Sequence, residues 1–94
     1  MLIARVIGTV VATRKHDRLV GCKIQIVQPL APDGSSRAGE PFVAVDAVGA
    51  GVDERVVVVT GSSARLAVDD ERAPVDATIV GIIDEVDVQE TSSP

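Results

Sequence analysis

The chain has 94 residues and a net charge of −5, and 46% of its residues are hydrophobic although Phe42 is the only aromatic one. This length corresponds to one small domain. Its acidity argues against nucleic acids as partners, because they are bound mainly through Lys and Arg. Cys22 is the only cysteine, so an internal disulfide is excluded.

The N-terminal stretch does not read as a signal peptide, because Arg5 interrupts its apolar residues. No apolar run approaches the ~20 residues that a membrane helix needs. We therefore expect a soluble cytoplasmic protein with no membrane partner. The 18 valines and 7 isoleucines favour strands and supply more apolar side chain than so small a core absorbs. An oligomer interface is the natural place for the excess.

Residues 2–13 form the first predicted strand. Its even positions are apolar or small and are expected to face the core, since successive side chains of a strand point to opposite faces. Its odd positions, which include Ile3, Arg5 and Ile7, mix apolar and polar residues and indicate a contact surface. Gly8 is expected to let the strand bend, as barrels require.

The second predicted strand places Cys22, Ile24 and Ile26 on its inward face, alternating with polar residues, and ends at Pro29. The third covers about residues 42–48.

The fourth predicted strand covers about residues 55–60 and contains the run 56–59, which is valine throughout. Such a run has no polar face, so both of its sides must be covered. A glycine turn, Gly49-Ala50-Gly51, precedes it.

After the fourth strand, the sequence predicts a short helix and a fifth strand. Either Ser62 or Ser63 can cap the helix formed by residues 64–67, and the fifth strand covers roughly residues 75–88. Five strands with tight turns predict an all-β fold, a small closed five-stranded barrel with one helix between its last two strands. We expect one domain over residues 1–88 and a polar C-terminal tail over residues 89–94.

No pattern in the chain predicts a catalytic, cofactor or metal site. The turn at Gly49 lacks the third glycine and the following helix of a nucleotide-binding loop. The serines after Gly61 lack a nucleophile elbow, and helix capping explains them better than anion binding. One histidine, His16, gives no zinc spacing, and the acidic sets at 69–71 and 84–87 are typical of solvated loops and strand edges.

The functional alternative is an oligonucleotide-binding-fold-like module for single-stranded nucleic acid or a small ligand. Nucleic-acid binding of that kind uses aromatic stacking platforms and a basic groove. One phenylalanine and an acidic balance argue against it.

Taken together, four segments resemble the pentamer-forming vertex proteins of bacterial microcompartments, found in carboxysomes and ethanolamine-utilisation shells. They are ARVIGTVVAT at 4–13 with Lys15, LVG at 19–21 with Lys23, DAVGAG at 46–51 with Glu54, and GSSAR at 61–65 followed by PVDA at 74–77. One departure is Asp53, where the family often has glycine. Aspartate tolerates a positive φ better than most residues, so only the local turn shape is affected.

The resemblance implies a structural protein rather than an enzyme, with no cofactor. Five copies form a ring through head-to-tail contacts, and the ring caps a five-fold vertex of a shell whose facets are hexameric tiles. The expected partners are therefore copies of the chain itself and hexameric shell proteins, in a cytoplasmic shell. The residues expected to contact a sibling or a tile are Ile3, Arg5, Ile7, Gly49, Ala50, Gly51, Glu54, Gly61, Ser62, Ser63, Ala64 and Arg65.

Overall fold

The computed structural model describes residues 1–11, 23–68 and 75–88. His16, Cys22, the acidic set at 69–71, the tail at 89–94 and the end of the expected first strand, residues 12–13, lie outside them. The described elements, in chain order, are β1 (Leu2–Val10), β2 (Lys23–Pro29), β3 (Phe42–Asp46), β4 (Arg55–Thr60), α1 (Ser62–Ala67) and β5 (Ala77–Ile82).

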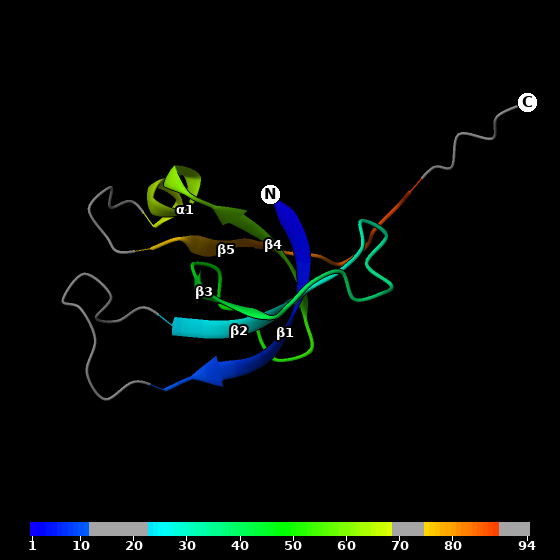
Figure 1. The fold of residues 1–94 in the computed structure, drawn as a ribbon, viewed down its shortest axis with the longest axis horizontal. Helices are drawn as coiled ribbons and strands as arrows, with labels where there is room; N and C mark the ends of the chain where they lie inside the picture. Colours follow the sequence, from blue (N-terminus) through cyan, green and yellow to red (C-terminus); the bar gives the residue numbers. More distant parts are fainter. Residues whose placement is uncertain (12–22, 69–74, 89–94) are drawn as a thin grey trace, which may run out of the picture.

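The five strands close into a barrel in the order β1-β2-β3-β5-β4, with α1 at one end of β4 and β5 (Figure 1). β3 and β5 pair in parallel, and the other neighbours pair antiparallel. The predicted fold class is confirmed, including the position of the helix between the fourth and fifth strands.

The barrel interior is filled by small and β-branched side chains, which suits a five-stranded barrel because its lumen is narrow. The even positions of β1 face inward as predicted at Ala4 and Val6, which are fully buried. The cluster they belong to comprises Ala4, Val6, Val27, Ala44, Ala50, Val56, Val58, Ala77 and Ile79, with Leu2 and Phe42 packed against it.

The valine run of β4 is covered on both sides over only part of its length. Val56 and Val58 are fully buried inside the barrel. On the other side, Val59 packs against a second cluster formed by Val45, Ala64 of α1 and Val75. Val57 is only half-buried, so the chain by itself leaves part of this face open.

β1 is shorter than predicted and carries a register irregularity. It ends at Val10, and Val11 is 90% exposed outside the strand. Its pairing with β2 shifts between Val6 and Gly8, so the irregularity falls at the glycine where the sequence predicted a bend.

The prediction of which face of β2 points inward was wrong. Gln25 and Val27 are fully buried, whereas Ile24 and Ile26 are half-buried. The reason is that Gln25 satisfies its polar groups inside: its Nε2 donates to the Ala50 carbonyl oxygen at 2.8 Å and to Asp46 Oδ2 at 3.2 Å. A buried amide that is fully hydrogen-bonded costs little.

β3 ends at Asp46 rather than at Val48, because the Asp46 carboxylate redirects the chain. It accepts backbone N–H bonds from Val48, Gly49 and Ala50 at 2.7–2.9 Å. Aspartate competes with the sheet ladder in this way wherever its side chain can reach the following amides.

β5 and α1 also differ from their predicted bounds. β5 covers Ala77–Ile82, and residues 83–88 follow outside the strand. α1 begins at Ser62 without a side-chain cap, and its N-cap residue is Gly61 with φ 66°. The predicted serine cap was therefore wrong. Glycine fits here because the chain needs a left-handed residue to leave β4 and enter the helix.

Candidate subunit-contact surface

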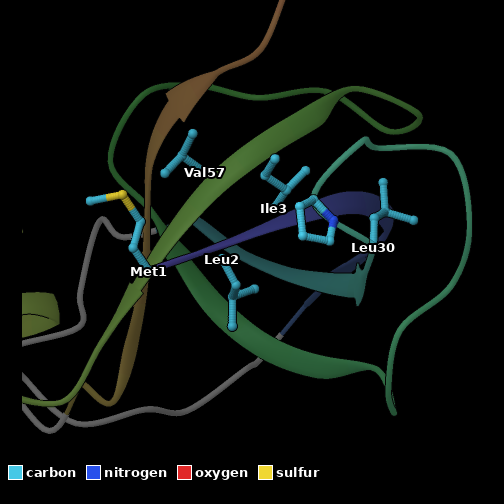
Figure 2. A pocket seen from close by; sticks show the side chains of 6 residues that line it. Met1, Leu2, Ile3, Leu30 and Val57 are labelled. Carbon is cyan, nitrogen blue, oxygen red and sulfur yellow. The ribbon is translucent and has the colours of Figure 1, made fainter. Parts of the chain in front are cut away.

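The outer face of β1 and β4 is apolar and hollowed. Ile3 and Val57 are register partners across the two strands, and Figure 2 shows their side chains on the same side of the ribbon, with Leu30 beside Ile3. A pocket of about 480 Å³ lies over them, lined by Met1, Leu2, Ile3, Leu30, Pro32 and Val57. We call it the apolar pocket. Large apolar side chains that a single chain leaves open are candidates for contact with another chain.

A second hollow adjoins the first, since Leu30 lines both. Its volume is about 380 Å³, and two cationic side chains, Arg5 and Arg37, stand at its wall. We call it the arginine groove. Its lining combines these charges with apolar and polar residues, namely Ile7, Gln28, Leu30, Ser35 and Pro41.

The outward odd positions of β1 reach both hollows. Ile3 lines the apolar pocket, and Arg5 and Ile7 line the arginine groove, where Ile7 is 47% exposed. The face on which the sequence predicts a contact surface is thus open and of mixed polarity in the structure.

The glycine turn lies against the same part of β1. Backbone bonds join Asp53 N to Val6 O at 2.8 Å and Val6 N to Glu54 O at 3.0 Å. Arg5 Nη1 donates to the Asp53 carbonyl at 2.9 Å. Glu54 Oε1 accepts from the Gly51 N–H at 2.7 Å, which closes the turn on itself. The structure thus brings the first-strand and turn residues together.

Asp53 has φ 75° and Gly49 has φ 79°. The position where the family often has glycine is therefore left-handed, as considered from the sequence, and aspartate occupies it. Ala50 is fully buried and its carbonyl accepts from Lys23 Nζ at 3.1 Å as well as from Gln25. Its methyl group supports the turn from inside and is not presented to another molecule.

The expected helix contact lies at the opposite end of β4. α1 packs on β4 and β5, and Thr78 Oγ1 donates to the Ala64 carbonyl at 2.8 Å. Ala64 is fully buried, Arg65 is half-buried, and Ser62 and Ser63 are exposed. Because β4 has six residues, roughly 17–20 Å of strand separates this patch from the glycine turn.

Sequence reasoning missed several residues of the open surface. They lie at the end of β2 and in the connection to β3, and they are Leu30, Pro32, Arg37 and Pro41. This connection folds over β1, since Leu30 N donates to Ile3 O at 2.9 Å, and Leu30 forms an isolated antiparallel β-bridge with Arg37. In the sequence, these positions differ from an ordinary loop only in having apolar residues among the turn residues. That pattern does not indicate which strand the loop packs against.

Within residues 1–11, 23–68 and 75–88, no three His, Cys, Asp or Glu side chains gather closely enough to hold a metal ion. None of the helices described there has the length and hydropathy to cross a membrane.

A closed five-stranded barrel with a short helix between its last two strands, and with apolar side chains such as Ile3 and Ile7 left open on its outer face, defines a class of small all-β barrel domains. The chain belongs to the EutN/carboxysome family, because the family model described as "Ethanolamine utilisation protein EutN/carboxysome" matches residues 1–84.

Relatives and solved structures agree with this assignment. The carboxysome shell vertex protein CcmL of Thermosynechococcus vestitus is 48% identical over 92% of this chain and 86% of its own length. The microcompartment shell vertex protein GrpN of Rhodospirillum rubrum is 44% identical over 93% and 97%. The structure of GrpN, a pentameric microcompartment shell protein, superposes with a TM-score of 0.84 at 42% identity over 95% of this chain and all of that one. A structure of EutN gives a TM-score of 0.88 at 42% identity over 94% and 91%.

Proposed function

We propose that this chain forms a homopentamer that caps the five-fold vertices of a bacterial microcompartment shell. The observation that carries the proposal is the full-length likeness to a pentameric shell protein, at a TM-score of 0.84. The relatives are named as shell vertex proteins of carboxysomes and other microcompartments, which supports a place in such a shell for this chain.

In this role the protein works through its shape. Flat tiling by hexamers cannot close, and five-fold corners supply the curvature, so the expected partners are hexameric shell proteins as well as four further copies of the chain. The proposed role needs no catalytic group, cofactor or membrane contact.

The geometry of the open surface suits a ring. A closed cyclic assembly with head-to-tail contacts uses two different patches on each copy. One patch is the outer face of β1 with the glycine turn, and the other is the start of α1 around Gly61 and Arg65. Because β4 separates them, one copy can engage a neighbour on each side.

Binding of single-stranded nucleic acid is less well supported as a function than the vertex role. Phe42 is the only aromatic residue, and it packs against the barrel interior, so no stacking platform is available from an aromatic side chain. The named relatives are shell proteins, which favours the vertex role over this alternative.

Native mass spectrometry tests the proposal directly. The expected species has the mass of five subunits and co-assembles with hexameric shell proteins into closed particles. A monomer or dimer that captures single-stranded nucleic acid in a salt-sensitive manner would contradict it.

Arg65→Ala tests the α1 patch. Because Arg65 lies at the helix and not in the barrel interior, we expect weakened assembly or shell closure with a barrel that still folds, checked by native mass and circular dichroism. Arginine can form directional hydrogen bonds with a neighbour's carboxylate or carbonyl. An unfolded variant, or unchanged assembly, would contradict this role.

A further inference from the structure

After β5 the chain continues as an extended acidic segment, residues 84–88, with the sequence Asp-Glu-Val-Asp-Val. We call it the acidic arm. The last backbone bond to the barrel within the described residues is from Ile83 N to Arg55 O at 2.8 Å. Beyond it, Figure 1 shows the arm, in orange, running past the loop between β2 and β3 and away from the barrel.

The arm has two chemically different sides. In an extended chain Glu85 and Asp87 point to one side, and Val86 and Val88 to the other. Val88 is 55% exposed and both acids are exposed. Val86 is half-buried, and one of its methyl groups lies close to Gly34 in the connection between β2 and β3. An extended segment with an apolar edge is suited to pairing with another chain.

The arginine groove has the complementary chemistry. Arg5 and Arg37 supply two positive charges in a protein whose net charge is −5, and Ile7 and Pro41 supply apolar surface beside them. Arg5 already donates one bond to the Asp53 carbonyl, and its guanidinium has further N–H donors. Arg37 is exposed. Arginine pairs well with carboxylates because its planar donors match them bidentately.

We propose that the acidic arm of one copy docks in the arginine groove of the neighbouring copy. Glu85 and Asp87 meet Arg5 and Arg37, while the valine edge lies on Ile7 and Pro41. The arm is not among the residues that line the groove of its own chain, and it runs away from its own barrel. Five extended residues reach roughly 17 Å beyond the end of β5.

This proposal rests on the proposed pentamer, because it assigns one of the contacts between its subunits. In a ring, each copy gives one arm and receives one, so five such contacts form without an unpaired groove or arm. Since the contact is largely electrostatic and lies near solvent, salt should weaken it.

Zero-length cross-linking tests the contact, with two chains co-expressed. The first carries Arg37→Lys, which supplies a reactive amine, together with Asp84→Asn, Glu85→Gln and Asp87→Asn. The second chain is unchanged. Native mass spectrometry first identifies pentamers that contain both chains. A carbodiimide then joins amines to carboxylates, and a link between position 37 and the acidic arm can only be intermolecular.

We expect this link in the mixed pentamers. The matched control moves the new amine to the α1 patch, with Arg65→Lys in place of Arg37→Lys, and should give no link to the arm. Mixed pentamers without a link at position 37, or with the same link from position 65, would overturn the docking proposal.

A second measurement follows the strength of assembly. Neutralising Glu85 and Asp87 should raise the subunit concentration at half-assembly about tenfold, because two partly exposed charge pairs are lost per contact. Val88→Ser should also weaken assembly, whereas Val43→Ser on β3 should not, although Val43 is equally exposed, at 55%. Equal effects of these two substitutions, or no effect of neutralisation, would contradict the proposal.

The two proposals fail in different ways. If the unchanged chain is not pentameric, both the proposed vertex role and the proposed arm contact are contradicted. If it is pentameric and neither the link nor the loss of affinity is seen, only the arm contact falls.

Discussion

The inner and outer faces of β1 differ in how far the chain itself covers them. Inside, Ala4 and Val6 are fully buried, and the same cluster uses three further alanines. Outside, Ile3 lines the apolar pocket and Ile7 is 47% exposed. In an ordinary monomeric domain the larger apolar side chains would be the buried ones.

Under the proposed pentamer, the inner face of β1 stabilises the fold of a single chain, and the outer face is available for contact between chains. A five-stranded barrel has a narrow interior, which here holds Ile79 and Gln25 besides alanines and valines, so it limits how much apolar surface one chain buries. Ile3, Val57 and Leu30 remain outside, over β1, β4 and the end of β2. Inner substitutions should therefore reduce the stability of the barrel, and outer ones should reduce assembly.

The largest expected effect separates two neighbouring valines. Val58 is fully buried in the barrel and Val57 is half-buried on the outer face. We expect Val58→Ala to lower the free energy of unfolding by about 2–3 kcal/mol, from lost apolar burial and the cavity it leaves. Val57→Ala should lower it by less than about 1 kcal/mol while it weakens the pentamer. Urea unfolding of dissociated protein, together with native mass, measures both effects. Equal loss of stability in the two variants would remove the distinction between the faces.

Gln25 tests whether the interior also depends on polar contacts. Its Oε1 accepts from Thr9 Oγ1 at 2.7 Å, and its Nε2 donates to the Ala50 carbonyl and to Asp46. Gln25→Leu keeps the volume similar but leaves the Ala50 carbonyl with only the bond from Lys23. We expect a loss of about 1–3 kcal/mol in urea unfolding. An unchanged midpoint would mean that the Gln25 bonds add nothing to a well-packed apolar interior.

Gln25 also explains the main limit of the sequence prediction. The number, order and approximate position of the strands could be predicted from β-branched runs and glycine turns, and β4 was predicted with its observed bounds, Arg55–Thr60. Which face of β2 points into the barrel could not be predicted, because alternation of apolar and polar residues identifies the inward face only when the outer face is polar. In this barrel Ile24 and Ile26 lie half-buried outside, while a satisfied glutamine lies inside.

The candidate surface was predictable in part for a related reason. Ile3, Arg5 and Ile7 were recognisable because their strand has one mixed face. Val57 belonged to a run whose two sides both needed cover, but its place opposite Ile3 depends on the register of β1 against β4. The arginine groove depends on a loop that folds back over β1, which alternation does not encode.

At the glycine turn, the backbone conformation of Asp53, rather than the burial of its side chain, is expected to decide the effect of a substitution. Its φ is 75°, and its N–H and C=O both bond to β1 residues. We expect Asp53→Val to cost about 1–2 kcal/mol, because a β-branched residue is disfavoured in the left-handed region. Asp53→Gly should cost less than about 0.5 kcal/mol, because glycine adopts this φ freely. Thermal unfolding compares the two, and a larger loss for glycine than for valine would contradict the backbone explanation.

The smallest expected effect lies on the exposed connection between β2 and β3. Ser35 donates its hydroxyl to Asp33 Oδ1 at 2.7 Å and its backbone N–H to the same oxygen at 2.9 Å, and these bonds lower the pKa of Asp33. The stabilising contribution of the ionised carboxylate is present at neutral pH and is lost as the pH falls through its folded-state pKa. Ser35→Ala removes the hydroxyl bond and leaves the backbone bond, so the pKa of Asp33 should rise part of the way toward its ordinary value. An NMR titration of the Asp33 carboxyl measures the shift, with the unfolding midpoint at neutral pH expected to change little because the group is fully exposed. A clear loss of stability from Ser35→Ala would mean that this outer loop supports the barrel, and that the division between inner and outer positions does not extend to it.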